Sequence, residues 1–320
     1  MKYYIGIDGG GSKTKFICFD AAGRKCAAAV TLGTYCAQDG IDAVLARLRD
    51  GISRCLPEET TDVVIGFGMP AYGENAELDT QAAERIRKAF FPMRVHIDND
   101  AAIGWAGSLA MKPGISVVAG TGSIAYGRDD SGKIERCGGW HEFFSDEGSG
   151  YWLGKQLLQL FSQESDGRLE RTALYELVRG ELALEEDFDM INLVNQTYAH
   201  SRKNTASLQK ILLKAARAGD PHALACYSHA SDELAKLIVT VLNKLDFPTS
   251  PIPVSFQGGL FALDDLIRQP VARKVRQAAA PREIDFCQPK FDPCRGAVLL
   301  AAAALEPENF EALRIKLSQG

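Results

Sequence analysis

Hydrophobic and polar positions at the start of the chain predict three strands in succession. Residues 3–7 and 15–19 are mostly apolar and are each expected to form a strand, and a third strand is expected over residues 26–32. Short glycine-containing turns separate these segments. The chain is therefore expected to open as an antiparallel meander before any helix.

A helical period follows the meander. Apolar residues recur at three- and four-residue intervals over residues 38–56, which predicts one amphipathic helix lying on the sheet. Strands are predicted over residues 63–68 and 94–97, with a helix over residues 80–90 between them. Alternating helices and strands after a meander favour an α/β fold with a mixed sheet and helices on its faces.

The same succession of antiparallel strands and glycine turns is expected a second time from about Ile115. A hairpin is predicted from residues 116–119 and 123–127, and a third strand over residues 133–137. Residues 151–245 are helical in pattern, residues 252–256 form a strand, and residues 293–319 form two helices separated near Pro307. The expected domains are residues 1–112, joined by residues 293–320, and residues 113–292, which carry the helical insertion.

Composition and charge exclude several classes of protein. The net charge of −5 argues against a general nucleic-acid binder, which needs a basic face. No run of about 18 apolar residues predicts a membrane span. The first residues enter a strand without the pattern of a signal peptide, which favours a cytoplasmic location. The 8 cysteines are scattered without a CxxC pair, so most are interpreted as reduced, small hydrophobic residues.

Two glycine-rich segments imitate known nucleotide-binding motifs. The turn from Gly6 to Thr14 looks like a P-loop, but its lysine comes one place too late and a strand follows where a helix is needed. The segment from Gly120 to Ala125 fits G-x-G-x-x-A, yet it also leads into a strand, whereas a dinucleotide fingerprint opens a helix. Both segments are instead predicted to be strand-connecting turns that bring bare backbone close to a ligand.

Asp100 is the candidate catalytic residue. It lies between a predicted strand and a predicted helix, where an aspartate can simply cap the helix. It can also project its carboxylate beyond the carboxyl end of a strand, where open α/β sheets place their chemistry. We expect Asp100 to act as a base, with Asp98, two residues earlier, as its competitor.

Six motifs in order make the chain resemble the N-acetylglucosamine kinase family, also described as BadF/BadG/BcrA/BcrD-type ATPases, within the acetate and sugar kinase, Hsp70 and actin superfamily. The resemblance implies two actin-like, ribonuclease-H-like domains with an ATP cleft between them, and homodimers are common in the family. It covers roughly residues 3–305. The motifs are residues 6–14, 99–101, 120–123, 138–140, 146–152 and 258–259.

The resemblance also implies ATP and Mg²⁺ as ligands. ATP phosphates need many N–H donors and a metal ion at close range. Asp8 is expected to orient water on Mg²⁺, and Gln257 precedes a turn expected on the adenosine side. The residues expected to bind ATP are Gly10, Gly11, Ser12, Lys13, Thr14, Gly120, Thr121, Gly122, Ser123, Gly258 and Gly259.

An amino sugar is the implied second substrate. Asp100 would accept the proton of the attacking hydroxyl, Trp140 would offer an apolar face to the ring, and carboxylates would accept hydrogen bonds from hydroxyls. The alternative is that Trp140 is a core residue. An asparagine common in the family is replaced near Cys36 here. The residues expected to contact the sugar are Cys36, Asn99, Gly139, Trp140 and Asp146.

The predicted function is that of an ATP-dependent kinase that phosphorylates an amino sugar. N-acetylglucosamine is the leading candidate substrate, with its 6-phosphate as the product. One alternative is an ATPase that activates a partner reductase, which would need cysteines placed for an iron–sulfur cluster. Cys287 and Cys294 are the only close pair. A second alternative is a sugar sensor without catalysis, in which Asp100 is dispensable.

Overall fold

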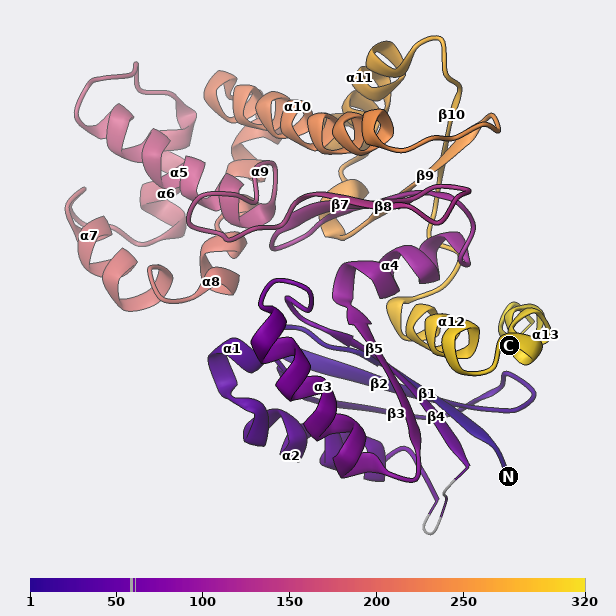
Figure 1. Cartoon of the computed structure of the whole chain (residues 1–320). Helices are drawn as coiled ribbons and strands as arrows, with labels where there is room; N and C mark the ends of the chain where they lie inside the picture. Colours follow the sequence, from indigo (N-terminus) through magenta and orange to yellow (C-terminus); the bar gives the residue numbers. More distant parts are fainter. Residues whose placement is uncertain (58–59, 61, 320) are drawn as a thin grey trace. The chain divides into compact units, whose positions relative to one another are not determined.

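The structure is a computed structural model that describes residues 1–57, 60 and 62–319. The chain forms two compact units (Figure 1). Unit 1 comprises Met1–Lys112 and Gln288–Gly320, and unit 2 comprises Pro113–Cys287. Over the described residues, none of the helices combines the length and apolar character needed to cross a bilayer.

The sheet of unit 1 begins with the predicted meander. Strands β1 (Tyr3–Asp8), β2 (Lys13–Asp20) and β3 (Lys25–Leu32) pair antiparallel. Strands β4 (Val63–Met69) and β5 (Arg94–Asn99) extend the sheet parallel to β1, in the order β3-β2-β1-β4-β5. The predicted mixed sheet is confirmed.

Two predicted helices of unit 1 have different bounds in the structure. The helix expected over residues 38–56 is wrong as a single element, because Gly40, with φ of +76°, separates α1 (Cys36–Asp39) from α2 (Ile41–Ser53). Helix α3 (Ala76–Phe90) begins four residues earlier than expected, because the side chain of Asn75 caps it by accepting from the Leu78 N–H at 3.1 Å.

Helices cover both faces of this sheet (Figure 1). On one face Ile5, Ile7 and Phe67 pack with residues of α2 and α3. On the other face Tyr4, Phe19 and Val64 pack with α12 (Pro293–Leu305) and α13 (Pro307–Leu317), so the two predicted C-terminal helices are confirmed. Successive strand residues alternate between the two cores, as the strand period requires.

Unit 2 repeats the strand plan of unit 1. Its sheet has the order β10-β9-β6-β7-β8, with an antiparallel meander extended by two parallel strands. This is the order of unit 1 read from the other edge, so the predicted duplication of architecture is confirmed. The strands are β6 (Gly114–Ala119), β7 (Ser123–Arg128), β8 (Ile134–Gly138), β9 (Ile252–Gln257) and β10 (Ile284–Cys287).

The predicted helical insertion is confirmed and lies between β8 and β9. Its longest helix, α10, packs on β6, β7 and β8. The helical elements of the insertion are α5 (Gly150–Ser165), α6 (Ala173–Glu181), α7 (Asp189–Leu193), η1 (Val194–Tyr198), α8 (Arg202–Ser207), α9 (Gln209–Arg217) and α10 (Pro221–Lys244). After β9 follow η2 (Gly259–Ala262), η3 (Asp264–Arg268) and α11 (Gln269–Ala279).

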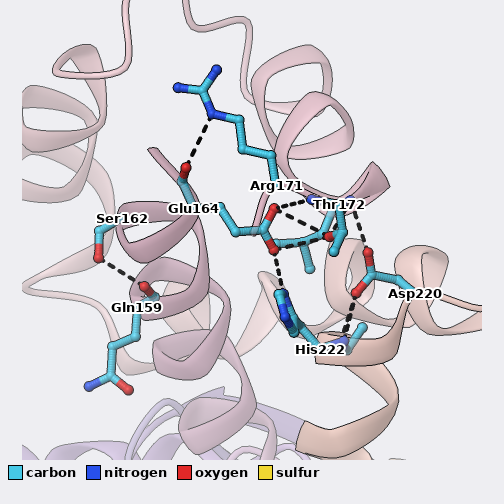
Figure 2. A network of polar contacts seen from close by, with 9 residues as sticks. Gln159, Ser162, Glu164, Arg171, Thr172, Asp220 and His222 are labelled. Carbon is cyan, nitrogen blue, oxygen red and sulfur yellow. Dashed lines mark hydrogen bonds and ion pairs between the residues drawn. The ribbon is translucent and has the colours of Figure 1, made fainter. Parts of the chain in front are cut away.

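A buried polar network joins three helices of the insertion (Figure 2). The fully buried carboxylate of Glu164, on α5, accepts from the Thr172 N–H at 2.9 Å and contacts His222 Nδ1 at 2.8 Å. Asp220 caps α10 and also accepts from the Leu174 N–H at 3.1 Å, at the start of α6. Every oxygen of the two carboxylates is thus satisfied, which ties α5, α6 and α10 together.

Candidate functional site

The carboxyl ends of three parallel strands bring the predicted acidic residues of unit 1 to one edge of its sheet. Asp8 on β1 is in register with Gly68 on β4, and Gly68 is in register with Asp98 on β5. Two strand spacings put the Cα atoms of Asp8 and Asp98 about 10 Å apart. Asp100 follows as the first residue of α4 (Asp100–Leu109).

Asn99, rather than Asp100, is the N-cap of α4. Its Oδ1 accepts from the Ala101 N–H at 2.8 Å, and its Nδ2 donates to the Tyr72 carbonyl at 2.7 Å. Asp100 Oδ1 also accepts from the Ala101 N–H, at 2.9 Å. Asp100 therefore lies at the sheet edge, in the first turn of a helix whose N-cap is Asn99.

Asp98 is engaged with its own strand. Its Oδ1 accepts from the Asn99 N–H at 2.7 Å, and its Oδ2 lies 3.6 Å from His96 Nε2. The buried Nε2 of His96 has no hydrogen-bond partner among the described residues. Asp98 and Asp100 each accept from the N–H of the following residue, so these contacts do not decide which of them is the base.

Asp8 has the environment of a carboxylate that can bind a cation. Burial raises its pKa to about 6, and the nearby Asp292 carboxylate also raises it, while Lys15 and Lys13 lower it. Mg²⁺ prefers oxygen ligands and binds through one or two carboxylates plus phosphate oxygens and water. Asp8 fits that donor set as a single carboxylate, whereas both oxygens of Asp292 are engaged with Arg295, through its N–H at 3.1 Å and its guanidinium at 2.8 Å.

The predicted phosphate turn of unit 1 joins β1 to β2. Gly11, Ser12 and Lys13 are exposed, so their N–H groups and side chains can reach a ligand. Thr14 is different, because its buried hydroxyl lies 2.9 Å from the hydroxyl of Thr34. Gly10 holds the turn by accepting from the Thr34 N–H at 3.0 Å.

Cys36 lies in the core rather than on the surface of unit 1. Its Sγ is 3.8 Å from Met69 Sδ, and burial raises the pKa of the thiol to about 11. Met69 is in register with Asn99, so Cys36 is close to the sheet edge that carries Asp100. A neutral thiol there can shape a pocket but has no charge to offer at neutral pH.

Two predicted turns meet at one sheet edge in unit 2. Strands β6 and β9 are parallel and adjacent, with Val118 in register with Gln257. The turn Gly120–Ser123 follows β6, and Gly258 follows β9 with φ of +94°. A side chain at Gly258 would overlap the Ala119 backbone, so the second turn lies directly against the start of the first. Gly259 then opens the 3₁₀ helix η2.

Asp146 is buried against the Gly120–Ser123 turn, being only 2% exposed. Its Oδ1 accepts from the Ser123 N–H at 3.1 Å, and its Oδ2 forms an ion pair with Arg202. The Ser123 hydroxyl donates to the Glu147 carbonyl at 2.8 Å. Sequence reasoning missed Arg202, because no motif marks a residue 56 positions from its partner.

Trp140 is 70% exposed, so the alternative that it is a core residue is wrong. It follows Gly139, which has φ of +65°, and precedes exposed Phe143 and Phe144. The ring of His141 stacks on Phe144 with centroids 6.0 Å apart. An exposed indole among further aromatic rings can present an apolar face to a ligand.

A separate cavity of about 620 Å³ lies over α10 and α11 in unit 2. Its walls include Trp152, His229, Asp232, Lys236 and Lys274. Lys274 Nζ donates to the Ser231 hydroxyl at 2.8 Å and also pairs with Asp232. None of the residues predicted for the site lines this cavity.

Comparison with known proteins agrees with the motifs. A profile of the BadF/BadG/BcrA/BcrD ATPase family matches residues 5–301. The chain is 29% identical to the N-acetylmuramic acid/N-acetylglucosamine kinase of Clostridium acetobutylicum, over 94% of this chain and 98% of the relative. It is 26% identical to the N-acetyl-D-glucosamine kinase of Dictyostelium discoideum, over 93% and 97%.

A solved structure shares the fold. A protein from Chromobacterium violaceum, named as a candidate N-acetylglucosamine kinase, superposes with a TM-score of 0.75 at 27% identity and covers 94% of this chain and 99% of its own. The predicted α/β fold is thereby confirmed.

Proposed function

Because the chain belongs to the BadF/BadG/BcrA/BcrD ATPase family, as its motifs predicted, we propose that it is an ATP-dependent kinase acting on an amino sugar. N-acetylglucosamine is the proposed acceptor and its 6-phosphate the proposed product. Two relatives that match nearly end to end carry the names of N-acetylglucosamine kinases, which supports this substrate class.

The observation that carries the proposal is the position of Asp100. It lies at the carboxyl edge of the unit 1 sheet, and the helix that it opens is already capped by Asn99. We propose that Asp100 accepts the proton of the sugar hydroxyl as its oxygen attacks the γ-phosphorus and the bond to ADP breaks. Phosphoryl transfer depends chiefly on such positioning and on charge stabilisation.

Unit 1 would bind the metal and part of the phosphate chain. Asp8 would hold Mg²⁺, which would neutralise charge on the phosphate oxygens. Gly10, Gly11, Ser12 and Lys13 would supply N–H groups and the lysine ammonium, and Thr14 would support the turn through its contact with Thr34.

Unit 2 would bind the rest of the nucleotide. Thr121 and Gly122 would donate backbone N–H groups to phosphate oxygens. Gly120 and Ser123 would shape this turn, because their N–H groups already donate to the Gly122 carbonyl at 2.9 Å and to Asp146 Oδ1 at 3.1 Å. Gly258 and Gly259 would let the adenosine lie against the backbone, because neither carries a side chain.

The sugar would be recognised by an apolar surface and a few polar groups. Trp140 beside Gly139 would pack against the ring, and Asn99 and Cys36 lie near Asp100 at the same sheet edge. Asp146 would contribute a buried carboxylate to this set; in the structure its oxygens accept hydrogen bonds from Ser123 and Arg202. A cytoplasmic location and a homodimer stay predictions.

Release of ADP from ATP·Mg²⁺ across a panel of amino sugars tests the proposal. Sugar-dependent release is expected for the wild type and lost in Asp100→Asn, with kcat reduced far more than KM. Asp98→Asn is the matched control and should keep most of the turnover. Phosphorus NMR of the product identifies the hydroxyl that is phosphorylated.

The alternative of an ATPase that activates a partner reductase makes the opposite prediction, since ATP turnover would not depend on sugar. The names of the matching relatives do not favour it. Cys287 and Cys294 also belong to different units, with Cys287 Sγ 3.8 Å from the Val254 carbonyl and Cys294 Sγ 3.5 Å from the Lys15 carbonyl.

A further inference from the structure

The loop between β4 and α3, residues 70–75, lies at the sheet edge of unit 1 that carries Asp100. It follows Met69, the last residue of β4, which is in register with Asn99 at the end of β5. Asn99 Nδ2 donates to the Tyr72 carbonyl of this loop at 2.7 Å, while Asn99 Oδ1 caps α4. The loop is therefore hydrogen-bonded directly to the residue that precedes the candidate base.

The backbone of this loop has a conformation that needs support. Ala71 has φ of +60° and Gly73 has φ of +94°. The left-handed region is unfavourable for alanine, and residues persist there only where surrounding contacts hold them. The Tyr72 N–H donates to the Met69 carbonyl at 3.2 Å, and the Glu74 N–H donates to the Ala71 carbonyl at 3.1 Å. These bonds are local, so contacts with other elements have to fix the loop on unit 1.

Asp79 on α3 supplies such a contact. The residue is 8% exposed, and its Oδ2 accepts from the Gly73 N–H at 2.8 Å and from the Asn75 N–H at 3.3 Å. Capping of α3 accounts for the bond from Asn75, which is the N-cap of that helix, but Gly73 lies two residues before the cap. A buried carboxylate is stable only when it is hydrogen-bonded, so Asp79 and the loop depend on each other.

Asp79 is also close to Cys36, which we propose to lie near the sugar. Burial, and after it the charge of Asp79, raises the pKa of the Cys36 thiol to about 11. Cys36 Sγ lies 3.8 Å from the sulfur of Met69, the residue at which the loop begins. Asp79, Cys36 and the loop thus form one cluster beside the sheet edge that carries Asn99.

We propose that Asp79 is a positioning residue for the acceptor side of the reaction: it holds the loop of residues 70–75 so that the Tyr72 carbonyl orients the Asn99 amide beside Asp100. Asn99 Nδ2 carries two hydrogens, so one of them can donate to a sugar while Tyr72 holds the other. This inference deepens the proposed function and rests on it.

Steady-state kinetics test the effect on the acceptor. Asp79→Ala is expected to lower kcat/KM for the sugar on the order of tenfold or more, because small displacements of groups near the reacting atoms have effects of this size. The KM for ATP should change by less than about threefold. Asp79→Asn should recover most of the loss, because its amide oxygen can still accept from the Gly73 N–H. Glu84→Ala, at an exposed acidic residue of the same helix, is the matched control.

A double-mutant cycle tests the route through Asn99. Asn99→Ser keeps a side chain that can cap α4 but lacks the amide that donates to the Tyr72 carbonyl. If Asp79 acts by orienting that amide, Asp79→Ala should lower kcat/KM for the sugar little further in the Asn99→Ser background. Full additivity of the two losses would overturn the inference.

Hydrogen–deuterium exchange without substrates gives a readout that does not depend on turnover. The amides of residues 71–75, and the Ala101 N–H that donates to Asn99 Oδ1, should exchange faster in Asp79→Ala than in the wild type. Glu84→Ala should exchange like the wild type. Unchanged exchange in Asp79→Ala, or an equal rise in the KM values for ATP and sugar, would also overturn the inference.

A second variant covers the case in which Asp79→Ala does not fold. Asp79→Leu removes the acceptor while keeping most of the side-chain volume, and the same losses are expected of it. Faster exchange in either variant, in a protein whose ATP turnover does not depend on sugar, would refute the kinase function. The anchoring of the loop and Asn99 by Asp79 would then still stand.

Discussion

Replacing Asp8 with asparagine should stabilise unit 1 and at the same time remove activity. Burial raises the pKa of Asp8 to about 6 from its ordinary 3.8, so the folded chain holds this proton more tightly than the unfolded chain does. Ionised Asp8 therefore lowers the free energy of unfolding. This loss of stability is absent below about pH 4, grows as the pH rises, and is complete above about pH 6.

The pKa difference sets the size of the effect. A difference of this size corresponds to roughly 3 kcal/mol, and partial exposure of Asp8 to water reduces it to about 2 kcal/mol. Asp8→Asn removes the charge and keeps the shape. The free energy of unfolding of the variant should thus exceed that of the wild type by about 2 kcal/mol near pH 7.5. This difference should vanish near pH 4.

Urea unfolding without nucleotide or Mg²⁺ can measure this in unit 1 alone. The chain has 3 tryptophans, and Trp105 lies buried in α4 of unit 1. In a Trp140→Phe, Trp152→Phe background, fluorescence therefore reports on the unit that contains Asp8. Asp42→Asn is the control, since the Asp42 side chain is 84% exposed and its loss should change stability little. An Asp8→Asn protein that gains no stability near pH 7.5, or whose gain does not depend on pH, would refute the reasoning.

Three further changes test which contacts stabilise each unit internally. Burial raises the pKa of Glu306, but hydrogen bonds from Lys2, Arg94 and Tyr4 lower it more, so the net direction is down. Glu306→Gln should therefore destabilise the protein by about 2 kcal/mol near pH 7, by urea unfolding, and the difference should disappear as the pH falls below about 4.5. Glu164→Ala should destabilise unit 2 by about 3 kcal/mol in thermal unfolding, because His222 and the Thr172 N–H lose their buried acceptor (Figure 2); an unchanged melting temperature would contradict this. Gly6→Ala should destabilise unit 1 by about 3 kcal/mol, because its methyl group would overlap the Cys294 carbonyl, whereas Gly11→Ala, with open space around it, should fold as well as the wild type.

Local signals predicted much of the fold of unit 1 and where its candidate acidic residues lie on the sheet. The strand–helix junction at Asp100 is visible in the sequence because an apolar strand stops there and a helical period begins. Parallel pairing of β1, β4 and β5 then brings Asp8 and Asp98 to the same edge without any further information. The repeated order of strands in the two units was predicted because each antiparallel meander has its own local hydrophobic pattern.

Tertiary contacts account for what the sequence analysis missed. The helical period continues through Gly40, so the break between α1 and α2 depends on a left-handed backbone conformation that periodicity does not record. Strand β10 has only four residues, one of them Asp285, and received no prediction. The pairing of Arg202 with Asp146 joins two elements of unit 2 with no local signal for either partner.

The packing of α12 has a consequence for the order in which the chain folds as it is synthesised. This helix covers Gly6 and Gly66 in the centre of the unit 1 sheet, and a methyl group on either glycine would overlap its backbone. All of unit 2 lies between β5 and α12 in the chain. A ribosome therefore completes unit 2 before it supplies the helix that closes one face of unit 1. Tyr4, Phe19 and Val64 of unit 1 therefore stay uncovered until α12 emerges from the ribosome. Their face of the sheet is the apolar surface that a chaperone would meet on the nascent chain.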